Sequence, residues 1–328
     1  MTTGSVVTAT RKAIGFDIGG TKISCGVITD KGDPVETLLP MHTPTDPTGT
    51  LDALRTAIQE LRGRHPEVSA IGVGAAGLIE WPGGHIRWAP NNSYHDMPLR
   101  RLLEDSCELP TVVDNDANVA AWAEQVLSSA PNYMLFLTVG TGVGGGLVLG
   151  GELYRGKSGI GGEVGHLIVD PRGNIRCGCG NLGCLEAVAS GTALGRYGRE
   201  AATADPGGTL ATLAGDPAKV NGETVFAAAL AGDLASRAIL RRAGDWLGIG
   251  IASLVNVLDL ERIVIGGGVA AAGDLLLDSA RASLERYLFA RAHRRIPEVV
   301  AAAQGADAGW MGAGLLALNE NAGMPSPV

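Results

Sequence analysis

One histidine and three cysteines stand close together near the middle of the chain, in a pattern typical of a zinc site. His166 ends a Gly-Glu-Val-Gly-His segment, and Cys177, Cys179 and Cys184 follow it. One imidazole and three thiolates can complete a closed tetrahedral zinc site, and the intervening glycines permit the tight loop that this requires. A zinc ion without an open coordination position would be structural. Reduced free cysteines in a loop are the alternative interpretation.

Two glutamates flank this cluster and are candidates for binding hydroxyl groups. Glu163 lies three residues before His166, and Glu186 lies two residues after Cys184. Glutamates are usually solvated on the surface, but a zinc loop would bring both carboxylates near the histidine. His166 could then ligate zinc through one ring nitrogen and hydrogen-bond a sugar through the other.

Two glycine turns that follow apolar segments are candidate phosphate sites. Bare backbone N–H groups and a hydroxyl at a tight turn allow a phosphate to approach. Either turn alone is also typical of an ordinary hairpin, but their matching positions favour the phosphate interpretation. Neither is a Walker A loop or a dinucleotide fingerprint. The candidate residues are Asp17, Gly19, Gly20, Thr21 and Lys22 in the first turn, and Thr138, Gly140, Thr141 and Gly142 in the second.

A polar run at a predicted helix start offers a candidate catalytic base. Asp114, Asn115 and Asp116 follow a short apolar strand and precede a helical pattern. Such residues are also typical helix N-caps, and for Asp114 capping is at least as good an interpretation. For Asp116 we favour catalysis, because a carboxylate beside a hydroxyl can accept its proton during phosphoryl transfer.

The pattern of apolar residues predicts the elements that would position these groups. Strands are expected at about 13–18, 23–29, 70–75, 111–113, 133–139, 146–149 and 262–265, and helices at about 50–62, 117–127, 223–256 and 274–290. Segment 204–222 is expected to be a surface loop. The strand, glycine turn and strand near the N-terminus recur from residue 133, which predicts two lobes built on one topology.

Composition limits the classes of protein that fit. A chain of 328 residues that is 45% hydrophobic is long enough for two domains. A net charge of −8 without a basic cluster argues against nucleic acid as a partner. No apolar run suits a membrane span or a signal peptide, so we expect a cytoplasmic protein without a membrane partner.

From about Ile14 to Gly314 the chain resembles the ROK family of repressors, open reading frames and kinases. Asp17–Lys22 and Thr138–Gly146 are similar to its two phosphate motifs, and Ile263–Val269 is similar to its adenosine motif. The resemblance implies a two-lobed α/β fold of the hexokinase, actin and Hsp70 type (ribonuclease H-like), with an interdomain cleft. The expected lobes are a small one, 1–122 with 311–328 returning to it, and a large one, 123–310, which carries the zinc loop and the oligomer interface.

The resemblance also implies the roles of individual residues. Asp116 would deprotonate the 6-hydroxyl of a hexose, Asp17 would lie near Mg²⁺ and the phosphates of ATP, and His166 would both hold the structural Zn²⁺ with the three cysteines and bind sugar. The remaining implied sugar contacts are Gly77, Asn91, Asn115, Glu163 and Glu186, and the implied adenosine contacts are Gly266 and Gly267.

The function that this resemblance implies is ATP-dependent phosphorylation of glucose at the 6-hydroxyl. Kinases for mannose, fructose or N-acetylmannosamine share the same motifs and remain alternatives, as does polyphosphate in place of ATP. A sugar-responsive repressor would need a helix-turn-helix domain, for which the dozen residues before the first strand are too few. We expect a homodimer or homotetramer by resemblance.

Overall fold

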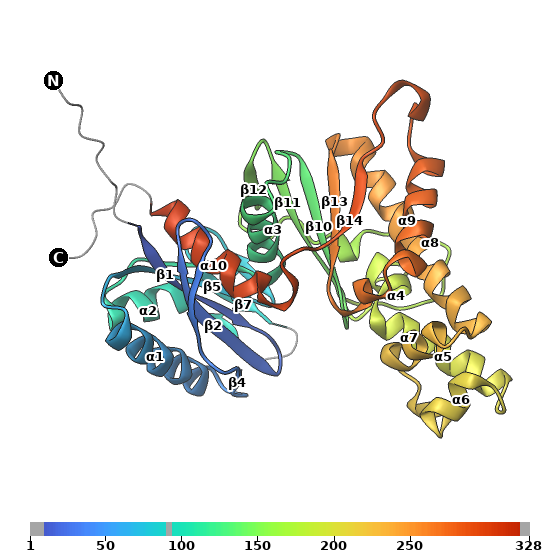
Figure 1. The fold of residues 1–328 in the computed structure, drawn as a ribbon, viewed down its shortest axis with the longest axis horizontal. Helices are drawn as coiled ribbons and strands as arrows, with labels where there is room; N and C mark the ends of the chain where they lie inside the picture. Colours follow the sequence, from blue (N-terminus) through green and yellow to red (C-terminus); the bar gives the residue numbers. More distant parts are fainter. Residues whose placement is uncertain (1–9, 90–93, 322–328) are drawn as a thin grey trace. The chain divides into compact units, whose positions relative to one another are not determined.

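The computed structural model describes residues 10–89 and 94–321, and its contacts divide the chain into two compact units. The first unit comprises residues up to Ser129, the segment Arg155–Gly161 and residues from Ala306 onward. The second unit comprises Ala130–Tyr154 and Gly162–Gly305. Figure 1 follows the chain from the blue strands of the first unit to α10, the red helix that belongs to the same unit.

A mixed sheet forms the centre of the first unit. Its strand order is β3-β2-β1-β5-β9, and β4 also pairs with β2. Strand β1 is antiparallel to β2 and parallel to β5, and β5 is parallel to β9. The bounds are Lys12–Ile18 for β1, Lys22–Thr29 for β2, Pro34–Thr37 for β3, Met41–His42 for β4, Val68–Ala75 for β5 and Thr111–Asn115 for β9.

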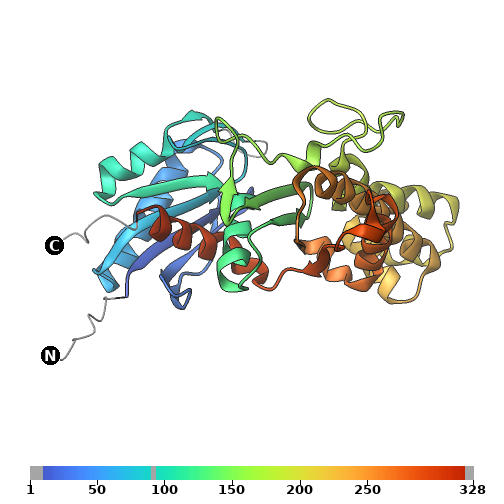
Figure 2. The same cartoon turned by 90° about the horizontal axis from the view of Figure 1, so that it is seen from above.

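Alternating side chains give this sheet two different faces. Ile14 and Phe16 belong to an apolar cluster with helices α1 (Pro47–Arg64) and α2 (Leu99–Cys107). On the other face, α10 (Ala308–Glu320) packs against β1, β5 and α3 (Asp116–Leu127), and Figure 2 shows the red helix lying along the blue strands. Glycine permits this close approach, because a Cβ on Gly72 would lie 1.8 Å from the carbonyl oxygen of Ala313.

A small antiparallel sheet follows β5 in the first unit. It consists of β6 (Leu78–Glu80), β7 (His85–Trp88) and β8 (His95–Met97), in that order. Ile79, Ile86 and Met97 join the cluster that includes α1 and α2. The excursion that the sequence predicts after residue 77 therefore has a sheet and an apolar anchor of its own.

The sheet of the second unit has the same design as that of the first. Its strand order is β12-β11-β10-β13-β14, with β10 antiparallel to β11 and parallel to β13. The bounds are Met134–Val139 for β10, Val143–Leu149 for β11, Glu152–Tyr154 for β12, Arg262–Gly266 for β13 and Glu298–Ala301 for β14. Matching order and direction confirm the prediction of two lobes built on one topology.

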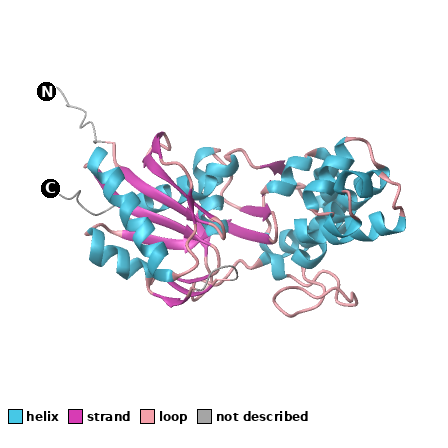
Figure 3. Ribbon diagram, turned by 90° about the horizontal axis from the view of Figure 1, so that it is seen from below, coloured by secondary structure: helices cyan, strands magenta, loops and turns pink. Residues whose placement is uncertain are grey.

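Helices make up most of the rest of the second unit (Figure 3). They are α4 (Leu185–Ala189), α5 (Gly191–Ala204), α6 (Thr209–Ala214), α7 (Gly222–Leu230), α8 (Leu234–Leu258) and α9 (Asp274–Tyr287). The prediction of one helix over 223–256 was wrong: Gly232, at φ +95°, separates α7 from α8, and Asp233 caps α8. The loop expected at 204–222 contains α6. Within the described ranges, no helix is both long and apolar enough to cross a membrane.

Candidate active site and metal centre

Three parallel strands of the first unit end at the same edge of their sheet, and this arrangement brings the candidate catalytic residues together. Asp17 precedes the last residue of β1, Gly77 lies just beyond β5, and Asn115 ends β9. The register pairs Asp17 with Gly74, and Gly74 with Asp114. Because the carboxyl ends of parallel strands meet at one edge, residues that are far apart in the sequence gather there.

The pKa values of Asp17 and Asp116 are both raised at this edge. Burial raises the pKa of Asp17 to about 7, with a further contribution from the negative charge of Asp116, while Lys22 opposes the shift. Burial also raises the pKa of Asp116, against the backbone N–H of Ala117, which donates to its carboxylate at 2.9 Å. Two carboxyl groups with raised pKa values at a strand edge are typical of a site that handles protons or metal ions.

Asn115 is the residue that caps α3. Its Oδ1 accepts hydrogen bonds from the backbone N–H groups of Ala117 at 2.8 Å and Asn118 at 3.3 Å, and its Nδ2 donates to the carbonyl of Gly77 at 3.1 Å. Gly77 itself has φ +125°, and a Cβ there would lie 2.3 Å from the carbonyl oxygen of Trp88. These contacts fix the start of α3 and therefore the position of Asp116.

The interpretation of Asp114 as a helix cap was wrong. This residue is buried, and its Oδ2 accepts a hydrogen bond from Arg155 Nε at 2.6 Å, while Oδ1 accepts from Asn118 Nδ2 at 2.8 Å. The guanidinium of Arg155 also lies 3.6 Å above the ring of Trp81. Asp114 thus holds the loop before Asp116 in place through a buried ion pair. Asn91, the other sugar contact expected in this unit, lies outside the described residues.

The first glycine turn joins β1 to β2. The backbone N–H of Gly19 donates to the carbonyl of Lys22 at 3.0 Å, and Thr43 Oγ1 donates to the carbonyl of Gly19 at 2.8 Å. Gly20, Thr21 and Lys22 are exposed. These hydrogen bonds fix the backbone of the turn, and its three exposed residues are accessible to a ligand.

The second glycine turn joins β10 to β11 and is held by α4 and α5. The carbonyl of Gly140 accepts a hydrogen bond from the Gly191 N–H at 2.7 Å, and Thr192 Oγ1 donates to the carbonyl of Thr141 at 2.7 Å. Glu186 Oε2 accepts from the N–H of Val143 at 3.1 Å, and a Cβ on Gly142 would lie 2.3 Å from the same oxygen. The absence of a side chain at Gly142 thus allows the carboxylate to approach the turn.

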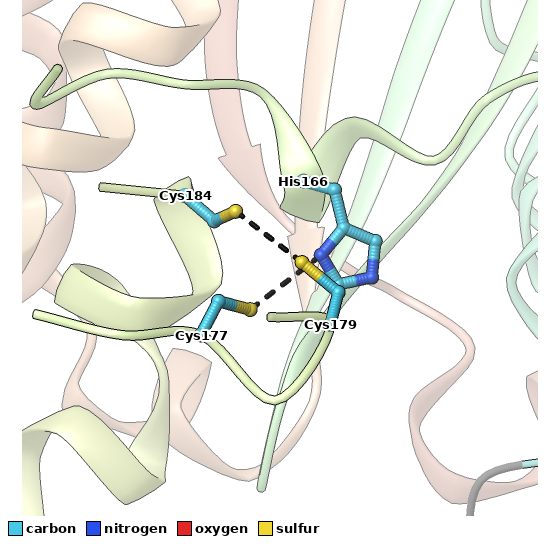
Figure 4. A group of neighbouring side chains, drawn as sticks. All are labelled: His166, Cys177, Cys179 and Cys184. Atoms are coloured by element: carbon cyan, nitrogen blue, oxygen red, sulfur yellow. Dashed lines mark hydrogen bonds between the residues drawn. The ribbon is translucent and has the colours of Figure 1, made fainter. Parts of the chain in front are cut away.

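The four predicted zinc ligands come together in the second unit (Figure 4). Their ligand atoms all lie within 4.8 Å of one another. The Sγ atoms of Cys179 and Cys184 are 3.7 Å apart, and Cys177 Sγ is 3.7 Å from His166 Nδ1. The other ring nitrogen of His166 points away from the sulfurs.

These distances fit a tetrahedral zinc ion. Zn–S bonds of about 2.3 Å place two sulfurs about 3.8 Å apart at tetrahedral angles. Burial raises the pKa of the Cys177 thiol to about 12, and a bound dication would favour its thiolate form. Cys177 Sγ also lies 3.4 Å from Glu186 Oε1, so this glutamate contacts both the cluster and the second glycine turn.

Glu163 and His166 belong to a short segment that packs on β11. A Cβ on Gly165 would lie 1.8 Å from the carbonyl oxygen of Val143, and the N–H of His166 donates to the carbonyl of Glu163 at 3.0 Å. Val143 also binds Glu186, so the start of β11 aligns the three predicted sugar-binding residues of this unit.

A cavity of about 610 Å³ opens beside the second glycine turn, and its size suits a nucleoside. Gly267 precedes the lining residue Gly268 and has φ +84°, and a Cβ there would be 2.6 Å from the carbonyl oxygen of Val139. The glycine turn and helices α5, α7 and α8 supply most of the wall. The lining residues are Gly140, Thr141, Gly191, Thr192, Leu194, Gly195, Arg199, Asn221, Gly222, Glu223, Phe226, Leu240, Gly268, Val269 and Ala272.

The sequence interpretation missed most of this wall. It named the strand-end glycines but not α5 or α7, which begin with Ser190-Gly191 and Asn221-Gly222. A capping residue followed by glycine, twice in one unit, was an available signal, because glycine at a helix start lets a ligand approach the free N–H groups.

Comparisons with known proteins identify the family to which this chain is similar. The model of the ROK family matches residues 13–320. A glucokinase from Streptomyces coelicolor is 38% identical over 309 residues, which cover 93% of this chain and 96% of that protein. An N-acetylmannosamine kinase from Escherichia coli is 35% identical over 311 residues, covering 94% and 98%. The crystal structure of a ROK family glucokinase from Streptomyces griseus in complex with glucose and AMPPNP superposes with a TM-score of 0.82 at 38% identity, covering 94% of this chain and 99% of that one.

Proposed function

This chain belongs to the ROK family, and from that membership we propose that it is an ATP-dependent glucokinase with the two-lobed hexokinase and actin type of fold. One observation of geometry carries the proposal. Asp116 begins α3 directly after β9, and Asp17 lies at the end of β1 before the first glycine turn, so both carboxylates lie at the same edge of the sheet. Phosphoryl transfer to a hydroxyl requires a general base near a phosphate-binding turn, and this edge of the sheet has a candidate for each.

In the proposed reaction the 6-hydroxyl oxygen of glucose attacks the γ-phosphorus of ATP. The new O–P bond forms as the bond from the γ-phosphorus to the bridging oxygen breaks, so ADP leaves and the phosphoryl group is transferred. Asp116 accepts the hydroxyl proton. The pKa of Asp116 is raised by burial, which makes this carboxylate a stronger base than an exposed aspartate.

Asp17, Thr21 and Lys22 are proposed to serve the phosphate end of the substrate. Mg²⁺, when bound with ATP, would neutralise charge on the transferring group, and Asp17 is the carboxylate that we propose would hold it. The exposed Lys22 would offset charge on the phosphates. Gly140, Thr141 and Gly142 are also proposed to bind phosphate, and Gly266 and Gly267 would leave room for the nucleoside.

Asn115, Glu163, His166 and Glu186 are proposed to contact glucose, with Gly77 and Asn91 as further contacts. His166 would hold a structural zinc ion through Nδ1, together with Cys177, Cys179 and Cys184, and bind sugar through the other ring nitrogen. In this role the zinc ion orients a substrate-binding residue.

ATP is the proposed donor because the second unit has a cavity for a base. Its wall includes Leu194, Phe226 and Val269, whose apolar surface suits an adenine ring. Polyphosphate has no group that would use such a wall.

An ADP-release assay tests the proposal on glucose, mannose, fructose and N-acetylmannosamine. Turnover should be highest with glucose, and Asp116→Asn should lower kcat by about 10² to 10⁴. Asp105→Asn, at an exposed aspartate of α2, is the matched control and should keep full activity. A preference for N-acetylmannosamine would assign the alternative substrate, and an active Asp116→Asn variant would refute the role of the base.

We also propose that the protein is a homodimer or homotetramer. Val257 at the end of α8 and Phe289 after α9 are 79% and 77% exposed, and Asn256 connects the two segments by accepting a hydrogen bond from the Phe289 N–H at 3.0 Å. Exposed apolar side chains on neighbouring segments are typical of a subunit interface. Light scattering should give two or four times the mass of one chain, and the mass of a single chain would contradict the proposal.

A further inference from the structure

A second cavity in the second unit is rich in arginine and has no part in the proposed reaction. Its volume is about 470 Å³, and Arg176, Arg196, Tyr197, Glu200 and Arg242 contribute to its wall. None of these residues lines the cavity proposed for the nucleoside. The zinc loop supplies Arg176, α5 supplies the next three residues, and α8 supplies Arg242.

The charges in this cavity are unbalanced. Three guanidinium groups face one carboxylate, that of Glu200, which leaves a local charge of plus two. In the part of the chain that the structure describes, none of the three arginines has an ion-pair partner. Arg176 donates to the carbonyl of Gly180 at 2.7 Å, and Arg196 donates to that of Ala187 at 2.8 Å. This local excess lies in a chain whose net charge is −8.

Tyr197 holds two of these guanidinium groups in place. The guanidinium carbons of Arg196 and Arg242 lie 4.7 Å and 4.3 Å from the centre of its ring. An aromatic face attracts cations and here keeps two of them together despite their repulsion. Arrangement on a ring also reduces the side-chain entropy that the arginines would lose on binding a ligand.

Two buried polar atoms at the same place have no partner. The hydroxyl of Tyr197 and Nε of Arg196 are enclosed, and neither makes a hydrogen bond within the described residues. Tyr197 as a whole is only 5% exposed. Buried polar groups are nearly always hydrogen-bonded, so these two atoms of cavity-lining residues favour a ligand that accepts hydrogen bonds.

From the charge, the aromatic support and the unpaired donors, we propose that this cavity is a binding site for a small phosphate monoester. A phosphate monoester carries a charge of about −1.5 to −2 at neutral pH, which matches the local excess. Its oxygens suit the planar fork of arginine, which binds phosphate through paired hydrogen bonds. A monocarboxylate would leave part of the charge unbalanced.

A ligand at this site would contact three elements of the second unit, namely the zinc loop, α5 and α8. Arg176 directly precedes the zinc ligand Cys177, and Arg196 is bonded to Ala187 on α4, the helix that carries Glu186. A ligand held by arginines from the zinc loop, α5 and α8 would therefore stabilise the second unit against unfolding.

Calorimetric titration of the zinc-loaded full chain tests the proposal, with inorganic phosphate and glycerol 3-phosphate as separate probes. Glucose and AMPPNP at saturation occupy the proposed active site, so the measured heat reports a different site. We expect one binding event for each chain, with glycerol 3-phosphate tighter than phosphate. Arg176→Gln and Arg242→Gln change exposed residues and should each weaken binding at least about tenfold.

Arg241→Gln is the matched control, because Arg241 is the exposed neighbour of Arg242 and does not line the cavity. It should leave the affinity unchanged. Equal weakening by all three substitutions, or no binding to the unaltered protein, would overturn the proposal. Absence of binding together with a changed oligomer mass in Arg242→Gln would assign the arginines to a contact between subunits instead. Because binding is measured directly, the result does not depend on kinase activity.

Discussion

Replacement of Arg155 by alanine should destabilise the first unit more than any surface substitution. Arg155 and Asp114 are 2.6 Å apart, with side chains only 11% and 3% exposed. Removal of one member of a buried ion pair leaves an uncompensated charge and costs about 3–5 kcal/mol. The contact with Trp81 at 3.6 Å adds about 0.5–2 kcal/mol. We therefore expect a loss of roughly 3.5–7 kcal/mol in the free energy of unfolding.

Urea unfolding followed by tryptophan fluorescence measures this loss. Four of the five tryptophans, at positions 81, 88, 122 and 310, lie in the first unit, so the signal reports that unit. Arg101→Ala is the matched control, since Arg101 is 81% exposed and pairs with Asp105 at 3.5 Å. Such a surface pair contributes at most about 1 kcal/mol.

A double-mutant cycle isolates the ion pair from the other contacts of Arg155. Asp114→Asn removes the carboxylate charge and keeps a side chain of similar size, so the two substitutions together should cost much less than the sum of their separate effects. Additive losses, or a loss from Arg155→Ala within about 1 kcal/mol of the Arg101→Ala control, would refute the assignment of a stabilising buried pair.

Three further predictions concern the metal, the packing of α10 and pH. Cys184→Ser should lower the zinc content from about one ion for each chain and raise the KM for glucose. Cys107→Ser, which changes a cysteine of α2, is the control and should leave both quantities unchanged. Elemental analysis measures the zinc content, and steady-state kinetics measure the KM. Gly72→Ala should lower the free energy of unfolding by about 1–3 kcal/mol, because its Cβ would lie 1.8 Å from a carbonyl oxygen of α10. Gly63→Ala, in open space on α1, should raise it by about 0.5–1 kcal/mol. Equal effects of the two substitutions in urea unfolding would contradict this packing. Burial raises the folded-state pKa of Asp17 from 3.8 to about 7, so its protonation stabilises the folded state. This contribution to the free energy of unfolding is fully present below about pH 4, and roughly 4 kcal/mol of it is lost as pH rises through 7. Unfolding in magnesium-free buffer should show this loss, and Asp17→Asn should remove it.

The sequence was most informative where chemistry and spacing lie within one short segment. The cysteines at 177, 179 and 184, with His166 shortly before them, predicted a metal cluster, and the structure brings all four ligand atoms within 4.8 Å of one another. The repeated strand, turn and strand predicted two lobes of one topology, because alternation and glycine position are properties of the local chain.

Helix boundaries were less accessible from the sequence. An alanine-rich stretch gives a continuous helical pattern, and only the positive φ of Gly232 and the cap at Asp233 divide α7 from α8. The role of Asp114 was also hidden, since a cap and a buried ion-pair member have the same local sequence. Its partner Arg155 lies 41 residues later.

By itself, therefore, the sequence determined the family, the repeated topology and the types of residue available for phosphate, sugar and zinc. Tertiary structure alone decided that Arg155 supports the loop before Asp116, that α5 and α7 line the cavity beside the second glycine turn, and that Arg176, Arg196 and Arg242 share one pocket. The physical reason is that a local sequence pattern indicates only the secondary structure of its own segment. Partners separated by tens of residues meet only when helices and sheets pack, and no spacing rule in the chain encodes that meeting.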